Sequence, residues 1–192
     1  DYVNLIPLSP GVRMNSILYN PNIFAGFAGI GVMVALGMAN TTQKTSARCY
    51  HLVCLYLSAL SFVLAFSMGG SGTIAVAFLI FLLLEHKDRR MSLLILMVET
   101  LLLTLFATFP IYLTSFKTWD GVQPIPLACA VGGAAVLCLL DCLLGRRLAA
   151  AMSRHAKAVA VTVVGVLAVA GLYAALALNI TGGVTVQSNT FT

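Results

Sequence analysis

Long apolar runs separated by short polar segments dominate the chain. Six runs stand out, at residues 23–39, 51–68, 72–85, 91–113, 127–145 and 158–178. The hydrocarbon core of a bilayer is about 30 Å thick, and an α-helix needs about 20 mainly apolar residues to cross it. The pattern therefore predicts an all-α, polytopic integral membrane protein built as a six-transmembrane-helix bundle.

The third run is the shortest, and a glycine cluster, MGGSG at 68–72, separates it from the second run. One helix over 51–85 would be about 50 Å long at 1.5 Å per residue, which is too long for the hydrocarbon core. Glycine interrupts helices and suits tight turns. We therefore expect two short spans joined by a turn at the glycine cluster.

Composition supports a membrane protein. The 192 residues are 60% hydrophobic and only 9% charged, whereas a typical soluble domain carries about 25% charged residues. The formal net charge is +5, but the basic residues occur in short clusters between apolar runs. Membrane topology explains such clusters better than nucleic-acid binding, so we expect no nucleic-acid partner.

The basic clusters predict an orientation. With six spans, the loops after the first, third and fifth spans share one side, which the positive-inside rule assigns to the cytoplasm, matrix or stroma. Both termini then face outside, as an outer segment 1–22 and an outer tail 179–192 around a transmembrane domain 23–178. The three loops hold nine of the eleven Lys and Arg residues: Lys44, Arg48, Lys87, Arg89, Arg90, Arg146, Arg147, Arg154 and Lys157.

The two larger basic loops also suit a membrane surface. Lysine and arginine at the interface attract anionic headgroups, each by about 1 kcal/mol. We therefore expect contacts with the lipid bilayer, including its anionic lipids. The residues expected at headgroups are Lys87, Arg89, Arg90, Arg146, Arg147, Arg154 and Lys157.

Two acidic residues fall inside predicted spans. Glu99 is the ninth residue of the run 91–113, about 12 Å into the membrane at 1.5 Å per residue. The favoured interpretation is a protonated side chain that is hydrogen-bonded to a neighbouring helix; contact with a partner subunit or lipid, and ion transport, are the alternatives. Asp141 lies near Arg146 and Arg147, and we expect an interfacial acid balanced by these neighbours.

Small residues line three of the predicted helices. Small side chains let helix backbones approach, and in lipid this close packing drives helix association. We expect most of these faces to pack within the bundle and one face to remain for other membrane subunits. The glycines expected at helix contacts are Gly26, Gly29, Gly31, Gly132, Gly165 and Gly171.

No sequence motif indicates catalysis or a cofactor. The five cysteines show no CxxC or Cys/His ligand spacing. His51, His86 and His155 fall at the inner interface rather than at the depth where a haem between helices would need them. Because a nucleophile–base pair, a phosphate-binding loop and paired carboxylates are also missing from the sequence, we expect no metal, no cofactor and no enzymatic activity.

These features favour a non-catalytic structural or accessory subunit of a larger membrane protein complex, of the respiratory, ATP-synthase or photosynthetic type. A small proton- or ion-coupled transporter or channel that uses Glu99 is the alternative. Because the sequence begins at Asp1 rather than Met, a membrane protein processed from a viral or secretory precursor is a third possibility. The pattern does not favour one cellular membrane over another.

Overall fold

The computed structural model describes residues 20–65, 67–114 and 124–145, all within one compact unit of the chain. The described residues form helices and no strands. The sixth predicted span, 158–178, lies outside them, as does the outer tail. The elements are α1 (Pro21–Thr41), α2 (Thr45–Leu64), α3 (Met68–Leu84), α4 (Lys87–Thr114), α5 (Pro124–Leu140) and a π-helical turn, η2 (Asp141–Gly145).

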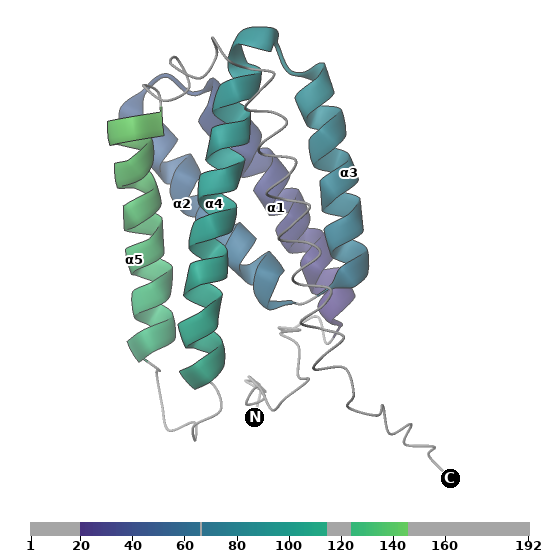
Figure 1. Cartoon of the computed structure of the whole chain (residues 1–192), viewed down its shortest axis with the longest axis vertical. Helices are drawn as coiled ribbons and strands as arrows, with labels where there is room; N and C mark the ends of the chain where they lie inside the picture. The colour runs from purple at the N-terminus through teal and green to yellow at the C-terminus, as the bar shows by residue number, and fades with distance from the viewer. Residues whose placement is uncertain (1–19, 66, 115–123, 146–192) are drawn as a thin grey trace. The chain divides into compact units, whose positions relative to one another are not determined.

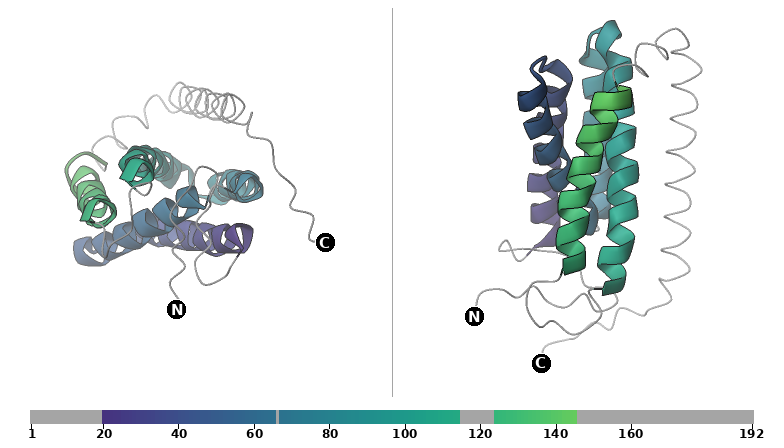
Figure 2. Two further views of the ribbon diagram at one scale, coloured as in Figure 1. Left: turned by 90° about the horizontal axis from the view of Figure 1, so that it is seen from below. Right: turned by 90° about the vertical axis from the view of Figure 1, so that its left-hand side faces the viewer.

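Consecutive helices run in opposite directions, so alternate connections meet at the same end of the bundle (Figure 1). The α1–α2 connection, the α3–α4 turn and η2 all lie at this end. α1 pairs most extensively with α2, α3 lies against α1, and α4 and α5 pack on α2 and on each other (Figure 2). The described basic residues belong to the same end: Lys44, Arg48, Lys87, Arg89 and Arg90.

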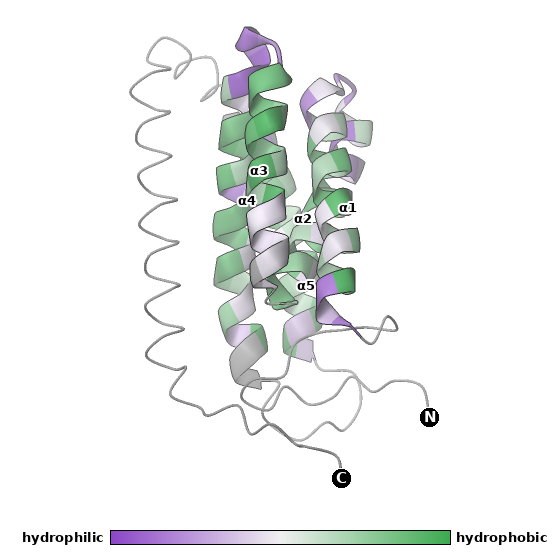
Figure 3. Ribbon diagram, turned by 90° about the vertical axis from the view of Figure 1, so that its right-hand side faces the viewer, coloured by the Kyte–Doolittle hydropathy of each residue, from purple (hydrophilic) through white to green (hydrophobic). Residues whose placement is uncertain are grey.

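Four of these helices are long and apolar enough to cross a membrane. Hydrophobic residues follow the middle of the helices, and hydrophilic ones gather towards their ends (Figure 3). Many large apolar side chains point outward, which suits a lipid environment. The described chain is therefore an all-helical, membrane-embedded protein with a fifth, shorter apolar helix, Gly69–Leu84. The four longer segments are Pro21–Thr41, Thr45–Leu64, Lys87–Ile111 and Pro124–Leu143.

Side-chain caps begin α1 and α3, and the cap of α3 also bonds to the first turn of α1. The Asn20 side-chain oxygen accepts a hydrogen bond from the Asn22 backbone N–H at 2.9 Å. The Ser67 hydroxyl oxygen accepts one from the Gly70 N–H at 3.0 Å and itself donates to the Asn22 side-chain oxygen at 2.9 Å. Each cap satisfies a helix N–H that has no partner within its own helix. The link between Ser67 and Asn22 holds the starts of α1 and α3 together.

The glycine cluster at 68–72 is helical, which corrects the expectation of a turn there. α2 ends at Leu64 and the next helix begins after its cap, Ser67, so the glycines form the first turn of α3. A Cβ atom at Gly70 would lie 3.1 Å from the Cβ of Ala25 on α1. Gly70 therefore permits a close approach of α3 to α1, and the serine cap marks the start of the helix.

Two of the expected packing glycines lie at helix contacts. A Cβ at Gly29 would meet the Phe62 ring of α2 at 3.6 Å, and one at Gly31 would lie 2.7 Å from the Ser58 hydroxyl. Both glycines therefore help α1 approach α2. A side chain at Gly31 would require Ser58 to move, because the Ser58 side chain occupies the space.

Two other expected glycines face outward. A Cβ at Gly26 or Gly132 would meet no atom of another residue within 4 Å, and both positions are exposed. They do not serve packing among the described helices. Gly165 and Gly171 lie outside the described residues.

The closest glycine contact is at Gly133 rather than Gly132. The ring of Tyr56 on α2 is fully buried and lies against Gly133 of α5, so closely that a Cβ there would overlap the phenol. The Tyr56 hydroxyl donates a hydrogen bond to the Cys129 carbonyl at 3.0 Å. The missing side chain at Gly133 lets α5 accept this large side chain, and the hydroxyl finds a partner on the same helix.

We expect Gly133→Ala to lower the free energy of unfolding by about 1–3 kcal/mol, because the added methyl group displaces the buried tyrosine. Gly132→Ala is the matched control, since it places the same methyl group on the open face of the same helix. Denaturant titration of both variants in detergent measures the difference. Equal stability of the two variants would show that Tyr56 does not pack against Gly133.

Candidate functional site

A buried ion pair joins α2 to the end of α5. Arg48 lies in the first turn of α2, and Asp141 is the first residue of η2. The Arg48 Nε donates to Asp141 Oδ2 and its Nη2 donates to Oδ1, both at 2.6 Å. The side chains are only 7% and 4% exposed. Two parallel hydrogen bonds between opposite charges make a short, directional contact, and such contacts are about twice as strong as neutral hydrogen bonds.

The same guanidinium also binds the end of α1. Arg48 Nη1 donates to the Ala39 carbonyl at 2.6 Å. Because α1 ends at Thr41, this carbonyl is among the last four of the helix, which have no partner within an α-helix. The Arg48 side chain therefore bonds a carbonyl at the end of α1 and neutralises the buried Asp141 carboxylate. These contacts connect α1, α2 and η2.

The apolar pattern of the sequence predicts Arg48 in a loop and Asp141 beside Arg146 and Arg147. α2 begins at Thr45, before the predicted start at residue 51, so Arg48 lies within the helix and faces the bundle. Arg146 and Arg147, the expected neighbours of Asp141, lie outside the described residues. The π-helical turn that starts at Asp141 is a rare conformation, which occurs mostly as single turns and often at functional sites.

Glu99 lies on α4 near this ion pair. It is half-buried, and both Arg48 and Asp141 are close enough to act on it electrostatically. Its Oε2 atom is buried and has no hydrogen-bond partner among the residues that the structure describes. The expected hydrogen bond from Glu99 to a neighbouring helix therefore stays a prediction.

The threonines that follow Glu99 use their hydroxyl groups within α4. Thr100, Thr104 and Thr108 are buried, and each donates to the carbonyl four residues earlier, at 2.7, 2.9 and 2.7 Å. Their side chains therefore satisfy local backbone groups, as serine and threonine often do in helices. This arrangement does not form a chain of polar groups leading away from Glu99.

Asn40 is a second buried polar group near the ion pair. It directly follows Ala39 and is only 7% exposed. Within the described ranges, neither its side-chain nitrogen nor its side-chain oxygen has a hydrogen-bond partner. Burying an unpaired amide costs roughly 2–7 kcal/mol, depending on the reference state. The polar cluster therefore consists of Arg48 from α2, Glu99 from α4 and Asp141 from η2, and Asn40 directly follows the residue whose carbonyl Arg48 binds.

The expected headgroup residues at the α3–α4 turn divide into two kinds. Lys87 and Arg89 are exposed. Arg90 instead donates to the Leu83 carbonyl at 2.6 Å and to the Glu85 carbonyl at 2.9 Å, so it caps the end of α3. The other expected headgroup residues, Arg146, Arg147, Arg154 and Lys157, lie outside the described residues.

The described residues hold no group of three or more His, Cys, Asp or Glu side chains that could bind a metal ion. Comparison with known proteins assigns no family: no protein-family model, curated protein or solved structure matches this chain. The function must therefore be argued from the polar cluster and from the outward faces of the helices.

We expect Arg48→Met and Asp141→Leu each to lower the free energy of unfolding by about 3–5 kcal/mol, because each leaves an unpaired buried charge. The double variant should recover most of the loss, since apolar residues of similar size replace a buried pair at little cost. Arg89→Met, at an exposed position, is the control. Denaturant unfolding of all four variants in detergent forms the test, and strictly additive losses would show that the two charges do not interact.

Proposed function

We propose that the chain is a non-catalytic structural subunit of a larger membrane protein complex, of the respiratory, ATP-synthase or photosynthetic type. The proposal rests on the buried charges, which bind groups of the protein itself. Arg48 and Asp141 bind each other and a helix end, with all three contacts at 2.6 Å. These two charges bind each other and a helix end, so neither of them is free to bind a substrate.

Exposed small residues on the outward faces of two helices also support the proposal. Gly26 lies on the exposed side of α1, and Gly132 lies on the exposed side of α5 with Ala128 and Ala135 close by on the same face. In lipid, a face of small residues lets another helix approach closely enough for extensive van der Waals contact. A structural subunit needs such a face for its neighbours.

The proposed topology has six spans, with both termini outside. The end that carries Lys44, Lys87 and Arg89 then faces the cytoplasm, matrix or stroma, where the positive-inside rule places short basic loops. Anionic lipids at this surface complete the proposed environment.

A proton- or ion-coupled transporter or channel is the second candidate, because of Glu99. Its buried Oε2 atom lacks a hydrogen-bond partner among the described residues. Intramembrane carboxyl groups often mark proton or ion pathways. Against this candidate, the neighbouring threonines bond to their own helix and form no continuous polar path.

We expect Gly132→Leu to release a partner subunit without lowering the chain's own stability. The added side chain enters space that no described residue occupies, yet it would separate a helix packed on this face. Val131→Leu, at the exposed neighbouring position, is the matched control. Native gels and mass spectrometry after mild-detergent extraction measure the complex, and thermal unfolding measures the chain.

Two results would count against this proposal. If the wild-type chain extracts alone, it is not a stable subunit of a complex. If Gly132→Leu instead unfolds the isolated chain, the contact lies within the chain and the argument from this face fails.

Glu99→Gln tests the second candidate, because it preserves shape and hydrogen-bonding capacity while removing the titratable proton. On the structural proposal, folding, assembly and proton flux in reconstituted vesicles should match the wild type across a pH series. Thr104→Val is a control for general disturbance of α4. A loss of proton flux in Glu99→Gln alone, with normal assembly, would favour the transporter.

A further inference from the structure

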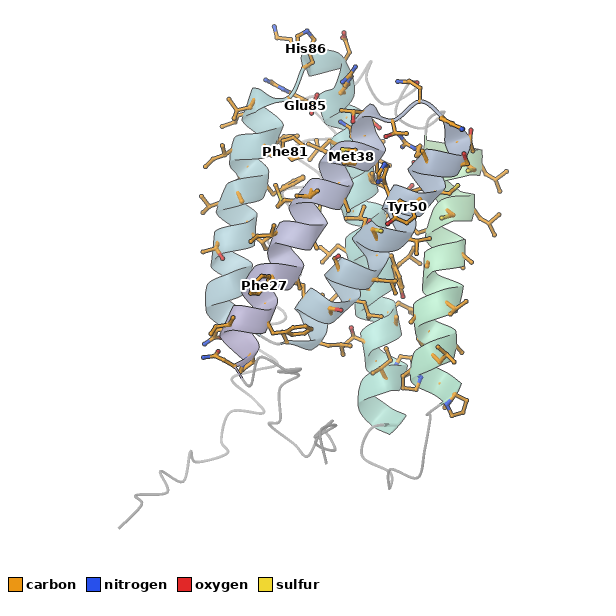
Figure 4. The ribbon with its side chains drawn as sticks, turned by 180° about the vertical axis from the view of Figure 1, so that it is seen from behind. Phe27, Met38, Tyr50, Phe81, Glu85 and His86 are labelled. Carbon is orange, nitrogen blue, oxygen red and sulfur yellow. The ribbon has the colours of Figure 1, made fainter. Side chains whose placement is uncertain are left out.

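An open hollow lies at the turn between α3 and α4. Figure 4 shows Glu85 and His86 at this turn, with Phe81 about one helical turn earlier, in α3. The hollow combines charged lining residues, here called its rim, with apolar ones. Its lining residues are Phe81, Leu84, Glu85, His86, Asp88 and Arg89.

Local contacts hold the turn in shape. Arg90 donates to the carbonyls of Leu83 and Glu85, and the His86 backbone N–H donates to the Glu85 Oε1 at 3.2 Å. The Phe81 ring lies close to α1, since a Cβ atom added at Gly37 would be 3.3 Å from it. Arg90 is therefore committed to the helix end, and Arg89 is the arginine at the rim.

The rim carries both signs of charge. Arg89 and Asp88 are exposed, and Glu85 is half-buried with one carboxylate oxygen used by the His86 N–H. A ligand with only negative charge would meet two carboxylates here. A ligand with only positive charge would meet the guanidinium. A ligand that carries a phosphate and an ammonium on a short linker offers a partner to each sign of charge.

The apolar side of the hollow leads onto the outer face of α3. Leu84 belongs to the lining and is 81% exposed, and Ile80 and Leu83 continue the exposed apolar surface towards the middle of the helix. In a membrane this surface faces acyl chains, while the turn lies at headgroup level. The two parts of the hollow therefore match the two parts of a phospholipid.

We propose that this hollow binds a phospholipid whose zwitterionic headgroup ends in a primary amine. Arg89 contacts the phosphate, Asp88 and Glu85 accept hydrogen bonds from the ammonium, and the acyl chains lie along α3. A primary ammonium has three N–H donors, whereas a trimethylated choline has none, so the carboxylates favour the amine. This inference is independent of the proposed subunit role, and it distinguishes this turn from a general anionic-lipid surface.

The test is native mass spectrometry of the full chain from bicelles that contain equal amounts of palmitoyl-oleoyl phosphatidylethanolamine, phosphatidylcholine and phosphatidylglycerol. We expect phosphatidylethanolamine to be retained roughly tenfold over phosphatidylcholine, as the loss of a charge-assisted hydrogen bond implies. The double variant Glu85→Gln, Asp88→Asn should abolish that preference, and Arg89→Gln should weaken retention of both lipids. Lys44→Gln, which removes a charge at the exposed α1–α2 connection outside the lining, is the control.

Two results would contradict the binding of an amine-headed phospholipid. Preferred retention of phosphatidylglycerol, unchanged in Glu85→Gln, Asp88→Asn, would overturn the proposal in favour of an ordinary anionic-lipid surface. Displacement of the bound lipid by an equal concentration of soluble phosphoethanolamine would overturn the lipid assignment and indicate a small-molecule site. Thermal unfolding of each variant confirms that retention is compared between folded chains.

Discussion

The contact between Arg48 and Asp141 sets the arrangement of the described helices at one end. Away from water, an unpaired charge or carbonyl is costly, so each such group must find a partner inside the protein. The guanidinium supplies three hydrogen bonds of 2.6 Å, two to the carboxylate and one to the Ala39 carbonyl. Because those acceptors belong to different helices, the end of α1, the start of α2 and the end of α5 must meet.

Away from the ion pair, close packing of side chains holds the helices together. Between helices in lipid, the hydrophobic effect offers little driving force, since the tails are as apolar as the side chains. Association depends instead on fit, which Gly31 provides towards Ser58 and Gly133 provides towards Tyr56. Two kinds of hydrogen bond accompany this fit: the Tyr56 hydroxyl bonds to a neighbouring helix, and the Thr104 hydroxyl bonds to its own helix backbone.

Hydropathy predicted where the described helices lie, but it could not predict how they meet. The first five apolar runs each coincide with a helix, because span length and apolar content follow from the bilayer itself. Hydropathy alone predicts that a charged residue such as Arg48 lies in a loop exposed to water. The charge is tolerated inside the bundle because it pairs with Asp141. Gly132 and Gly133 are identical in a pattern of small residues, and only the tyrosine across the interface distinguishes them.

The balance of charge in the polar cluster connects its geometry to the proposed role. Arg48 and Asp141 cancel each other, so together they offer Glu99 a nearby dipole rather than a net positive charge. An ionised Glu99 would need a counter-charge that the described residues do not supply at this position, whereas an uncharged one needs only a hydrogen-bond partner. Asn40, also unpaired among these residues, adds no charge either. In the proposed role, Arg48 and Asp141 neutralise each other and an uncharged Glu99 adds no further charge, which favours cohesion between helices over the binding and release of ions.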